Sequence, residues 1–316
     1  MRCSLALILL AAVLASGSAL SAPGKTAITR LRVPVLAAAN VGFRADGVKA
    51  VVGDTTAKVV ALASPAEDLI LMLVLDLAGD VTVAQRGKQA LLDEIQQLPR
   101  QTHIALLRAQ DGLRVIQDPT MDRPAIKKAI ESLPVGGRAG LVDSIETAAA
   151  IGDSMLSKSA VRVAILYITD SEVTNYRQDF TNPVINSSDA GDLSRKFPEA
   201  LIQEKISKLN TNLTRTQVPV FVVHLTYRSD RLNEAYLNGL RQLAISTGGM
   251  AVVCRSSAEI PAAIRDVVAT IVNHYSVTLE VPRMPARPVA VNLQIAGPDG
   301  APQALAYRSV FVLKDE

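Results

Sequence analysis

The chain has 316 residues, which is long enough for one large domain or for a medium domain with a smaller companion. Its apolar fraction of 49% and charged fraction of 20% predict a sizeable core and exclude wholesale disorder. The formal charge is only +3 and the basic residues form no stripe, so nucleic acid is not an expected partner.

Residues 1–22 have the layout of a secretory signal peptide. Arg2 supplies a positive start, Leu5 to Ala15 form an apolar stretch, and small residues follow as far as Ala22. The apolar stretch is too short to span a bilayer permanently. We therefore expect a mature chain that is secreted or periplasmic and has no stable membrane span. A retained N-terminal anchor helix is the alternative.

Both ends of the expected mature chain have β-like sequences. Residues 23–67 contain short β-like runs separated by the turn signals RADG and VVGD, and no stretch has helical periodicity. Residues 274–316 contain the alternating runs SVTLEV and PVAVNLQI, with PDG marking a turn. We expect short strands in both segments, and the two segments could pair to form one small β module.

Residues 68–273 alternate between strand-like and helix-like stretches. LILMLVLD, VRVAILYITD and VPVFVVHL are continuous apolar runs, typical of strands covered on both faces. Helix-like stretches such as VAQRGKQALLDEIQQL separate them. This alternation predicts an α/β fold: a doubly wound, mainly parallel six-stranded sheet with helices on both faces.

Acidic residues follow two of the predicted strands. Asp76 ends LILMLVLD, Asp80 comes one short loop later, and Asp170 follows VAILYIT. A third loop, PVGGRAGLVDS at 134–144, opens a helix, and a polar stretch at 171–195 leaves a buried strand. Ligands of doubly wound sheets bind beyond the carboxyl ends of the strands. We therefore expect these loops to converge on one face.

The order of these motifs resembles the von Willebrand factor type A domain, also called the I-domain. The strand ending in Asp76, a helix, two strands, the GG-x-x-x-LVDSI helix and AILYITDSE with Asp170 follow one another in the sequence. LRQLAISTGGMAVV and AAIRDVVATIVNHYSVTLEV match the late part of that family. The resemblance spans residues 26–290 and is strongest over 68–273. It is closest to exported bacterial proteins that place such a domain between β segments.

The resemblance implies a metal-ion-dependent adhesion site. In that family the first loop is Asp-x-Ser-x-Ser, a glycine-containing loop supplies a Thr, and an Asp ends the fourth strand. Mg²⁺ in such a site takes about six oxygen ligands, and a partner's acidic side chain completes the sphere. By this resemblance Asp76, Asp80 and Asp170 occupy metal positions, and Mg²⁺ or Ca²⁺ is the implied ion.

The chain departs from the family's pattern at three ligand positions. Ala78 and Asp80 stand where the family has serines, and Ala139, beside Arg138, stands where it has the threonine. One hypothesis is a degenerate site without an ion, in which Arg138 or a proton on one acid offsets the repulsion between the acids. A second is that Asp80 compensates as a carboxylate ligand. A third is that the acids have no joint role.

Two further residues belong to the expected binding face. Asp143 lies in the first turn of its predicted helix, where the helix dipole favours an acid. Ser171 follows Asp170 in the polar stretch. The loops at 76–80, 136–143 and 170–195 are the segments that we expect to contact a partner.

These patterns favour an exported, non-catalytic binding protein that contacts a protein or cell-surface partner through the strand-end face. The sequence contains neither a phosphate-binding loop nor a nucleophile-elbow motif. His103, His224 and His274 lie in or beside apolar runs, so we expect them to be structural. A divalent-metal-dependent enzyme using the three aspartates and a structural envelope component are the alternative hypotheses.

Overall fold

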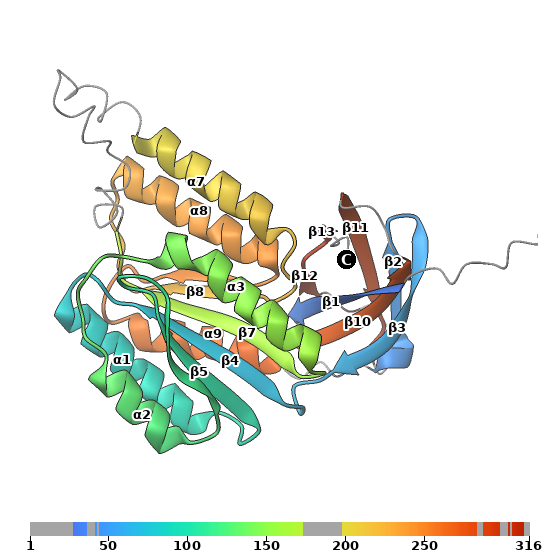
Figure 1. The fold of residues 1–316 in the computed structure, drawn as a ribbon, viewed down its shortest axis with the longest axis horizontal. Coiled ribbons are helices and arrows are strands. Elements are labelled where there is room, and N and C mark those ends of the chain that lie inside the picture. The colour runs from blue at the N-terminus through green and yellow to red at the C-terminus, as the bar shows by residue number, and fades with distance from the viewer. Residues whose placement is uncertain are drawn as a thin grey trace, which may run out of the picture.

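The computed structural model describes residues 28–312, apart from 37–41, 43, 173–197, 283–286, 298–302 and 304. The expected signal peptide at 1–22 and nearly all of the polar stretch at 171–195 lie outside the described residues. The described part consists of an α/β domain and a β module at one end of it (Figure 1). Within that part, no helix combines the length and the apolar character needed to cross a membrane.

The α/β domain is built on a six-stranded sheet with the order β6-β5-β4-β7-β8-β9. All neighbouring strands are parallel except the edge pair β5–β6, which is antiparallel. All eight residues of β7, and all but one of β4, are buried, as expected for central strands covered on both faces. The strands are β4 (Leu69–Asp76), β5 (Thr102–Arg108), β6 (Arg114–Thr120), β7 (Arg162–Thr169), β8 (Val220–His224) and β9 (Ala251–Val253).

Helices cover both faces of this sheet (Figure 1). One face packs on α1 (Val81–Gln97), α2 (Arg123–Ser132) and α9 (Ile260–Asn273), and the other on α3 (Leu141–Lys158), α7 (Pro198–Leu213) and α8 (Arg231–Thr247). Alternate residues of β4 enter different cores, because successive side chains of a strand point to opposite faces: Leu73 lies in the first core and Met72 in the second. The doubly wound α/β fold expected from the sequence is confirmed.

The β module is one antiparallel sheet of seven strands with the order β12-β1-β10-β3-β2-β11-β13. Strand β1 lies between β10 and β12, with Val33 opposite Val277, so segments from the two ends of the chain pair as expected. A separate core of mostly aliphatic side chains fills the module. The strands are β1 (Ile28–Leu36), β2 (Val48–Val52), β3 (Thr55–Ala63), β10 (Tyr275–Pro282), β11 (Pro288–Ile295), β12 (Ala306–Tyr307) and β13 (Val310–Val312), and a short 3-10 turn, η1 (Ala45–Gly47), precedes β2.

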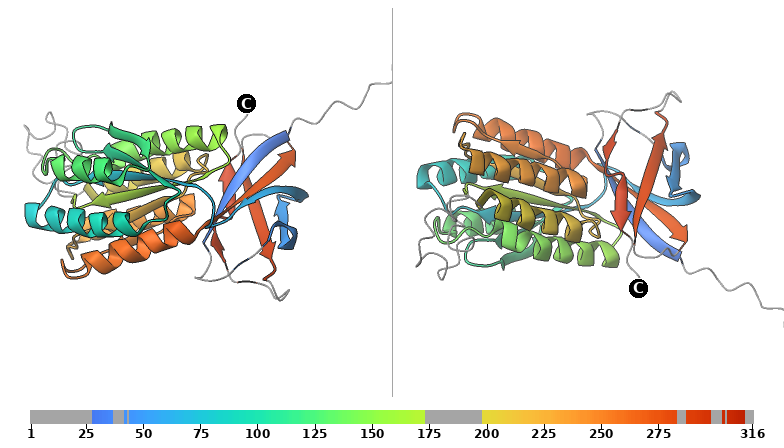
Figure 2. Two further views of the ribbon diagram at one scale, coloured as in Figure 1. Left: turned by 90° about the horizontal axis from the view of Figure 1, so that it is seen from below. Right: turned by 90° about the horizontal axis from the view of Figure 1, so that it is seen from above.

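The β module sits against the end of the α/β domain where α3, α7 and α9 finish (Figures 1 and 2). Arg162, at the start of β7, is 1% exposed and contacts four backbone carbonyls. Its Nη1 donates to Val272 O (2.8 Å) and His274 O (2.9 Å) at the end of α9, and its Nη2 donates to Pro65 O (3.0 Å) and Glu67 O (2.9 Å). Burial lowers the pKa of Arg162 to about 10, so it remains charged at neutral pH.

Two arginines of the β module likewise donate hydrogen bonds to backbone carbonyls at the ends of other helices. Arg308 is 5% exposed, and its guanidinium donates to Thr216 O (2.6 Å), Thr214 O and Leu213 O (3.4 Å) at the end of α7. Arg32 of β1 donates to the carbonyls of residues 159 and 161, just after α3. The last carbonyls of a helix lack partners within the helix, and the dipole makes that end negative. These arginines therefore join the two regions through helix C-termini.

Candidate functional site

The candidate site lies at the pole of the α/β domain opposite the β module, where β4 and β7 end (Figure 1). Asp76 is the last residue of β4 and pairs in register with Thr169, the last residue of β7. Asp170 follows directly. The parallel register therefore brings the two sequence-predicted acids to the same edge of the sheet, beside the N-terminus of α3.

The carboxylate of Asp76 is fully buried and receives four hydrogen bonds. Its Oδ1 accepts from Gly140 N (3.0 Å), and its Oδ2 accepts from Leu141 N (3.1 Å). Oδ2 also accepts from the hydroxyls of Ser171 (2.9 Å) and Thr169 (3.3 Å). Four donors match the acceptor capacity of a carboxylate. Asp76 therefore acts as the N-terminal cap of α3, whose own cap residue is a glycine without a side-chain oxygen.

Burial and hydrogen bonding shift the pKa of Asp76 in opposite directions. Burial raises the pKa, and the hydrogen bonds from Gly140, Ser171, Leu141 and Thr169 lower it. The N-terminus of α3 also favours the ionised form, because the first N–H groups of a helix carry partial positive charge. The positive end of α3 thus lies directly at the Asp76 carboxylate.

Gly140 makes this arrangement sterically possible. A Cβ at this position would lie 1.9 Å from the carbonyl oxygen of Ala109, so no larger residue fits without a backbone shift. The backbone of α3 thereby approaches the loop after β5 closely, with its first N–H groups directed at Asp76. The glycine in the PVGGRAGLVDS loop is thus required by packing.

Asp170 is 2% exposed and is held by the loop after β4. Its Oδ1 accepts from Ala78 N (2.8 Å) and Gly79 N (3.0 Å), whereas its buried Oδ2 has no hydrogen-bond partner among the described residues. Burial raises the pKa of Asp170 to about 6, and the neighbouring charge of Asp76 adds to the increase. A proton on Oδ2 is therefore the simplest way to relieve repulsion between the two acids.

Asp80 lies at the start of α1. Its side chain is exposed, and Oδ1 accepts from Thr82 N (2.7 Å) and Val83 N (3.0 Å), which makes it the N-cap of α1. These hydrogen bonds lower the pKa of Asp80. In the described ranges, no group of three His, Cys, Asp or Glu side chains is arranged to hold a metal ion. The hypothesis that Asp80 compensates as a carboxylate ligand stays a prediction, and in this structure its carboxylate caps α1.

The other expected face residues divide into buried and exposed positions. Ala139 and Ser171 are buried and Ala78 is partly buried, so these three support the loops and present little surface to a partner. Arg138 is exposed, and its backbone exchanges two hydrogen bonds with Asp111: Arg138 N donates to Oδ1 (2.9 Å), and Arg138 O accepts from Asp111 N (3.0 Å). The N-terminus of α3 supplies partial positive charge to Asp76.

Asp143 lies in the first turn of α3, as expected from the sequence. It is exposed and forms an ion pair with Lys205 of α7. This contact links two helices on the same face of the sheet at the strand-end pole. Asp143 therefore contributes to the surface near Asp76. It is not among the residues that donate hydrogen bonds to Asp76 or Asp170.

His224 lies next to Ser171, although from the sequence we expected it to have only a structural role. It ends β8 and is 3% exposed; its Nε2 lies 2.8 Å from Ser171 O, and its Nδ1 lies 2.6 Å from Thr226 O. Burial lowers its pKa, which favours the neutral ring. The available signal was its position at the carboxyl end of a parallel strand, the same position that singled out Asp76 and Asp170.

Comparisons with known proteins concern the fold only. No protein-family model matches the sequence, and neither does any curated protein. A von Willebrand factor type A structure from Catenulispora acidiphila is similar over 92% of this chain and 74% of that chain, with 12% identity and a TM-score of 0.45. A mutant of the PilB minor pilin from Streptococcus sanguinis is similar over 65% and 62%, with 11% identity and a TM-score of 0.49.

A third similar structure is the proximal thread matrix protein 1 of the mussel byssus with a zinc-occupied MIDAS motif. It is 16% identical over 71% of this chain, with a TM-score of 0.43, and this chain spans about half of its length. At these values the comparisons carry no argument about activity or partners. The strand order, the helix layers and the succession of motifs are themselves those of a von Willebrand A-like fold, as the sequence resemblance indicated.

Proposed function

We propose that this protein is an exported, non-catalytic binding protein that contacts a protein or cell-surface partner without the aid of a metal ion. The contact surface would be the strand-end face, which we define as the exposed positions of the loops at 76–80 and 136–143 together with the first turns of α1 and α3. The polar stretch at 171–195 is expected to extend it. The observation that carries this proposal is the saturation of Asp76 by the N-terminus of α3.

The donor set does not fit Mg²⁺ or Ca²⁺. Both ions need several oxygen ligands with free lone pairs around one point. Here Asp76 already accepts four hydrogen bonds, the carboxylate of Asp80 caps α1, and alanines stand at positions 78 and 139. Binding an ion would require breaking the cap of α3. Recognition by this face therefore rests on its shape and its exposed charges.

The hydrogen bonds of the cluster also support a non-catalytic role. The hydroxyl of Ser171 donates to Asp76, and both ring nitrogens of His224 face backbone carbonyls. A nucleophilic serine needs a base that can accept its proton, and a general base needs a free lone pair near a substrate. Asp76 accepts the hydrogen bond of Ser171, but Ser171 is fully buried and His224 is only 3% exposed, so neither side chain is open to a substrate. Both side chains instead support the ends of β7 and β8.

Site-directed photocrosslinking tests the proposed contact surface. Val81, at the start of α1, is 60% exposed on the strand-end face, and Ile28, in the β module, is 64% exposed, so they form a matched pair. A photoreactive amino acid at position 81 is expected to give a discrete high-mass adduct in cells that export the protein, and the same group at position 28 is not.

The pattern of adducts separates the hypotheses. Adducts formed only from position 28 would contradict the proposal and favour the structural envelope component whose β ends mediate assembly. Equal adducts from both positions would indicate nonspecific proximity and would also contradict it. An adduct that persists after chelation of divalent ions agrees with a metal-independent contact.

A further inference from the structure

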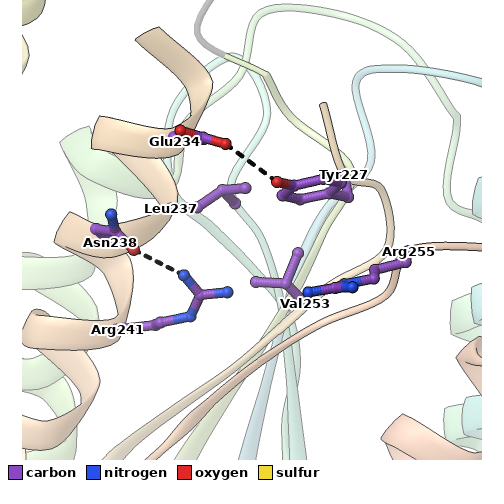
Figure 3. Close-up of a pocket in the computed structure, with 7 residues that line it drawn as sticks. All are labelled: Tyr227, Glu234, Leu237, Asn238, Arg241, Val253 and Arg255. Atoms are coloured by element: carbon purple, nitrogen blue, oxygen red, sulfur yellow. Dashed lines mark hydrogen bonds between the residues drawn. The ribbon is translucent and has the colours of Figure 1, made fainter. Parts of the chain in front are cut away.

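A cavity of about 250 Å³ opens between α8 and the ends of β8 and β9. The close-up in Figure 3 shows Arg241 reaching in from α8 and Arg255 reaching in from just beyond β9, so that the two guanidinium groups approach the same space from opposite sides. In the described part of the chain, no carboxylate forms an ion pair with either of them. We call this cavity the arginine pocket.

Both arginine side chains are exposed, and each guanidinium group makes one local contact that favours its orientation. Arg241 Nη1 donates to Asn238 Oδ1 at 2.7 Å, one turn earlier in α8. The guanidinium carbon of Arg255 lies 5.8 Å from the centre of the Tyr227 ring, within the range of a cation–π contact. Orienting the side chains in advance reduces the conformational entropy lost on binding. Two oriented guanidinium groups are well suited to an oxyanion.

The other walls of the arginine pocket limit the kind of anion. Glu234 also lines it and accepts a hydrogen bond from Tyr227 Oη at 3.2 Å, so two positive charges and one negative charge face the cavity (Figure 3). A doubly charged phosphate costs more to desolvate than a singly charged carboxylate and is repelled more strongly by Glu234, so we expect the carboxylate to be preferred. Leu237 and Val253 add apolar surface between the charges, which suits a few methylene groups.

We propose that the arginine pocket binds a carboxylate carried on a short aliphatic stem, such as a glutamate side chain of a partner protein. This inference rests on the proposed function, since it names the chemistry by which a partner is recognised at the strand-end pole. His224 connects α8, which forms one wall of the arginine pocket, to the residues around Asp76. The His224 ring packs edge-on against Tyr236 of α8, with 6.2 Å between the ring centres, and its Nε2 lies 2.8 Å from the carbonyl oxygen of Ser171. The Ser171 hydroxyl in turn donates to Asp76.

Titration of the isotope-labelled full chain with propionate, the acid of a glutamate side chain, tests the pocket. The side-chain Nε–Hε signals of Arg241 and Arg255 are expected to shift and saturate in the millimolar range, and inorganic phosphate is expected to bind more weakly. Arg241→Gln and Arg255→Gln should each weaken propionate binding by about tenfold. Arg114→Gln removes the same charge from an exposed position of β6 and should leave binding unchanged.

Three results would overturn the inference: signals that drift without saturating, equal weakening by Arg114→Gln, or phosphate binding as tight as that of propionate. Photocrosslinking from position 81, repeated in the two arginine variants, separates this inference from the proposed function. If the adduct at position 81 forms unchanged in both arginine variants, the partner does not use the pocket, although the strand-end face still binds it. If propionate binds saturably but the chain with both arginines intact gives no adduct from position 81, the proposed function is refuted. The inference that the arginine pocket binds a carboxylate would still hold.

Discussion

The two poles of the α/β domain bury charges of opposite sign. At the strand-end pole, Asp76 and Asp170 are buried and accept hydrogen bonds from backbone N–H groups. At the pole that meets the β module, Arg162 and Arg308 are buried and donate to backbone carbonyls. No buried ion pair is needed at either pole, because the backbone supplies the compensating groups.

This difference follows from the winding of the fold. In a parallel sheet with helical crossovers, the helices begin near the carboxyl ends of the strands and finish near the amino ends. Unpaired N–H groups and positive partial charge therefore gather at one pole, and unpaired carbonyls and negative partial charge at the other. Acids suit the first environment and arginines the second. A helix N-terminus can therefore hold a buried acid at the first pole.

The largest effect is expected at the pole with the arginines. Arg162→Ala should lower the free energy of unfolding by about 4 kcal/mol, because it leaves a cavity and removes the donor shared by four carbonyls from two chain segments. Urea unfolding measures this change. Arg114→Ala, at an exposed position, should change it by less than about 0.5 kcal/mol. Equal effects of the two substitutions would refute the role given to Arg162.

A somewhat smaller effect is expected at the strand-end pole. Asp76→Ala should cost about 3 kcal/mol, since two backbone N–H groups and two hydroxyls lose their buried acceptor. Asp143→Ala provides the matched control, because it removes an exposed acid from the first turn of the same helix and should cost less than about 1 kcal/mol. Hydrogen exchange of the first turn of α3 should accelerate in the first variant only.

The smallest effect concerns the pH dependence contributed by Asp170. Its pKa in the folded chain is about 6, above the usual 3.8, so the folded state holds the proton more tightly than the unfolded state does. Its contribution to stability is therefore complete below pH 3.8 and is lost as the pH rises through 6. The loss is about 2 kcal/mol between these limits.

Asp170→Asn isolates this contribution, because it keeps an oxygen at Oδ1 for the two loop N–H groups and cannot ionise. The variant should lack this part of the pH dependence and should be more stable than the parent chain at neutral pH. His274, whose pKa burial lowers to about 4, acts in the opposite direction, since its contribution is lost as the pH falls from 6.5 to 4. That effect cancels when the two chains are compared at each pH. A parent chain whose stability does not fall between pH 4 and 7 relative to the variant would contradict the raised pKa.

Local patterns in the sequence were sufficient for the fold and for the expectation that Asp76 and Asp170 lie at the same edge of the sheet. The continuous apolar run LILMLVLD is enough to predict a strand that is buried on both faces. Its last residue, Asp76, is then expected at the carboxyl end of that strand. The N-cap role of Asp80 was also available locally, because an aspartate directly before a helix is a start signal. The family resemblance directed attention to its metal-ligand position instead.

Long-range partners could not be inferred from one sequence. The two backbone donors to Asp76 come from residues 64 and 65 positions away, and the acceptors of Arg162 lie in two segments on either side of it in the chain. An arginine at the start of an apolar strand gives no indication of which carbonyls surround it. The same limit explains Ser171, which was expected on the binding face and is buried against Asp76 and His224.

The central claim is that the N-terminus of α3, and not a cation, holds Asp76. Calorimetric titration of the protein with Mg²⁺, Ca²⁺ and Mn²⁺ tests it most directly, with Asp76→Ala and Asp170→Asn as comparison variants. We predict no saturable heat at ion concentrations up to about millimolar, the weak end of the range for protein sites. A dissociation constant tighter than about millimolar that either substitution abolishes would contradict the claim.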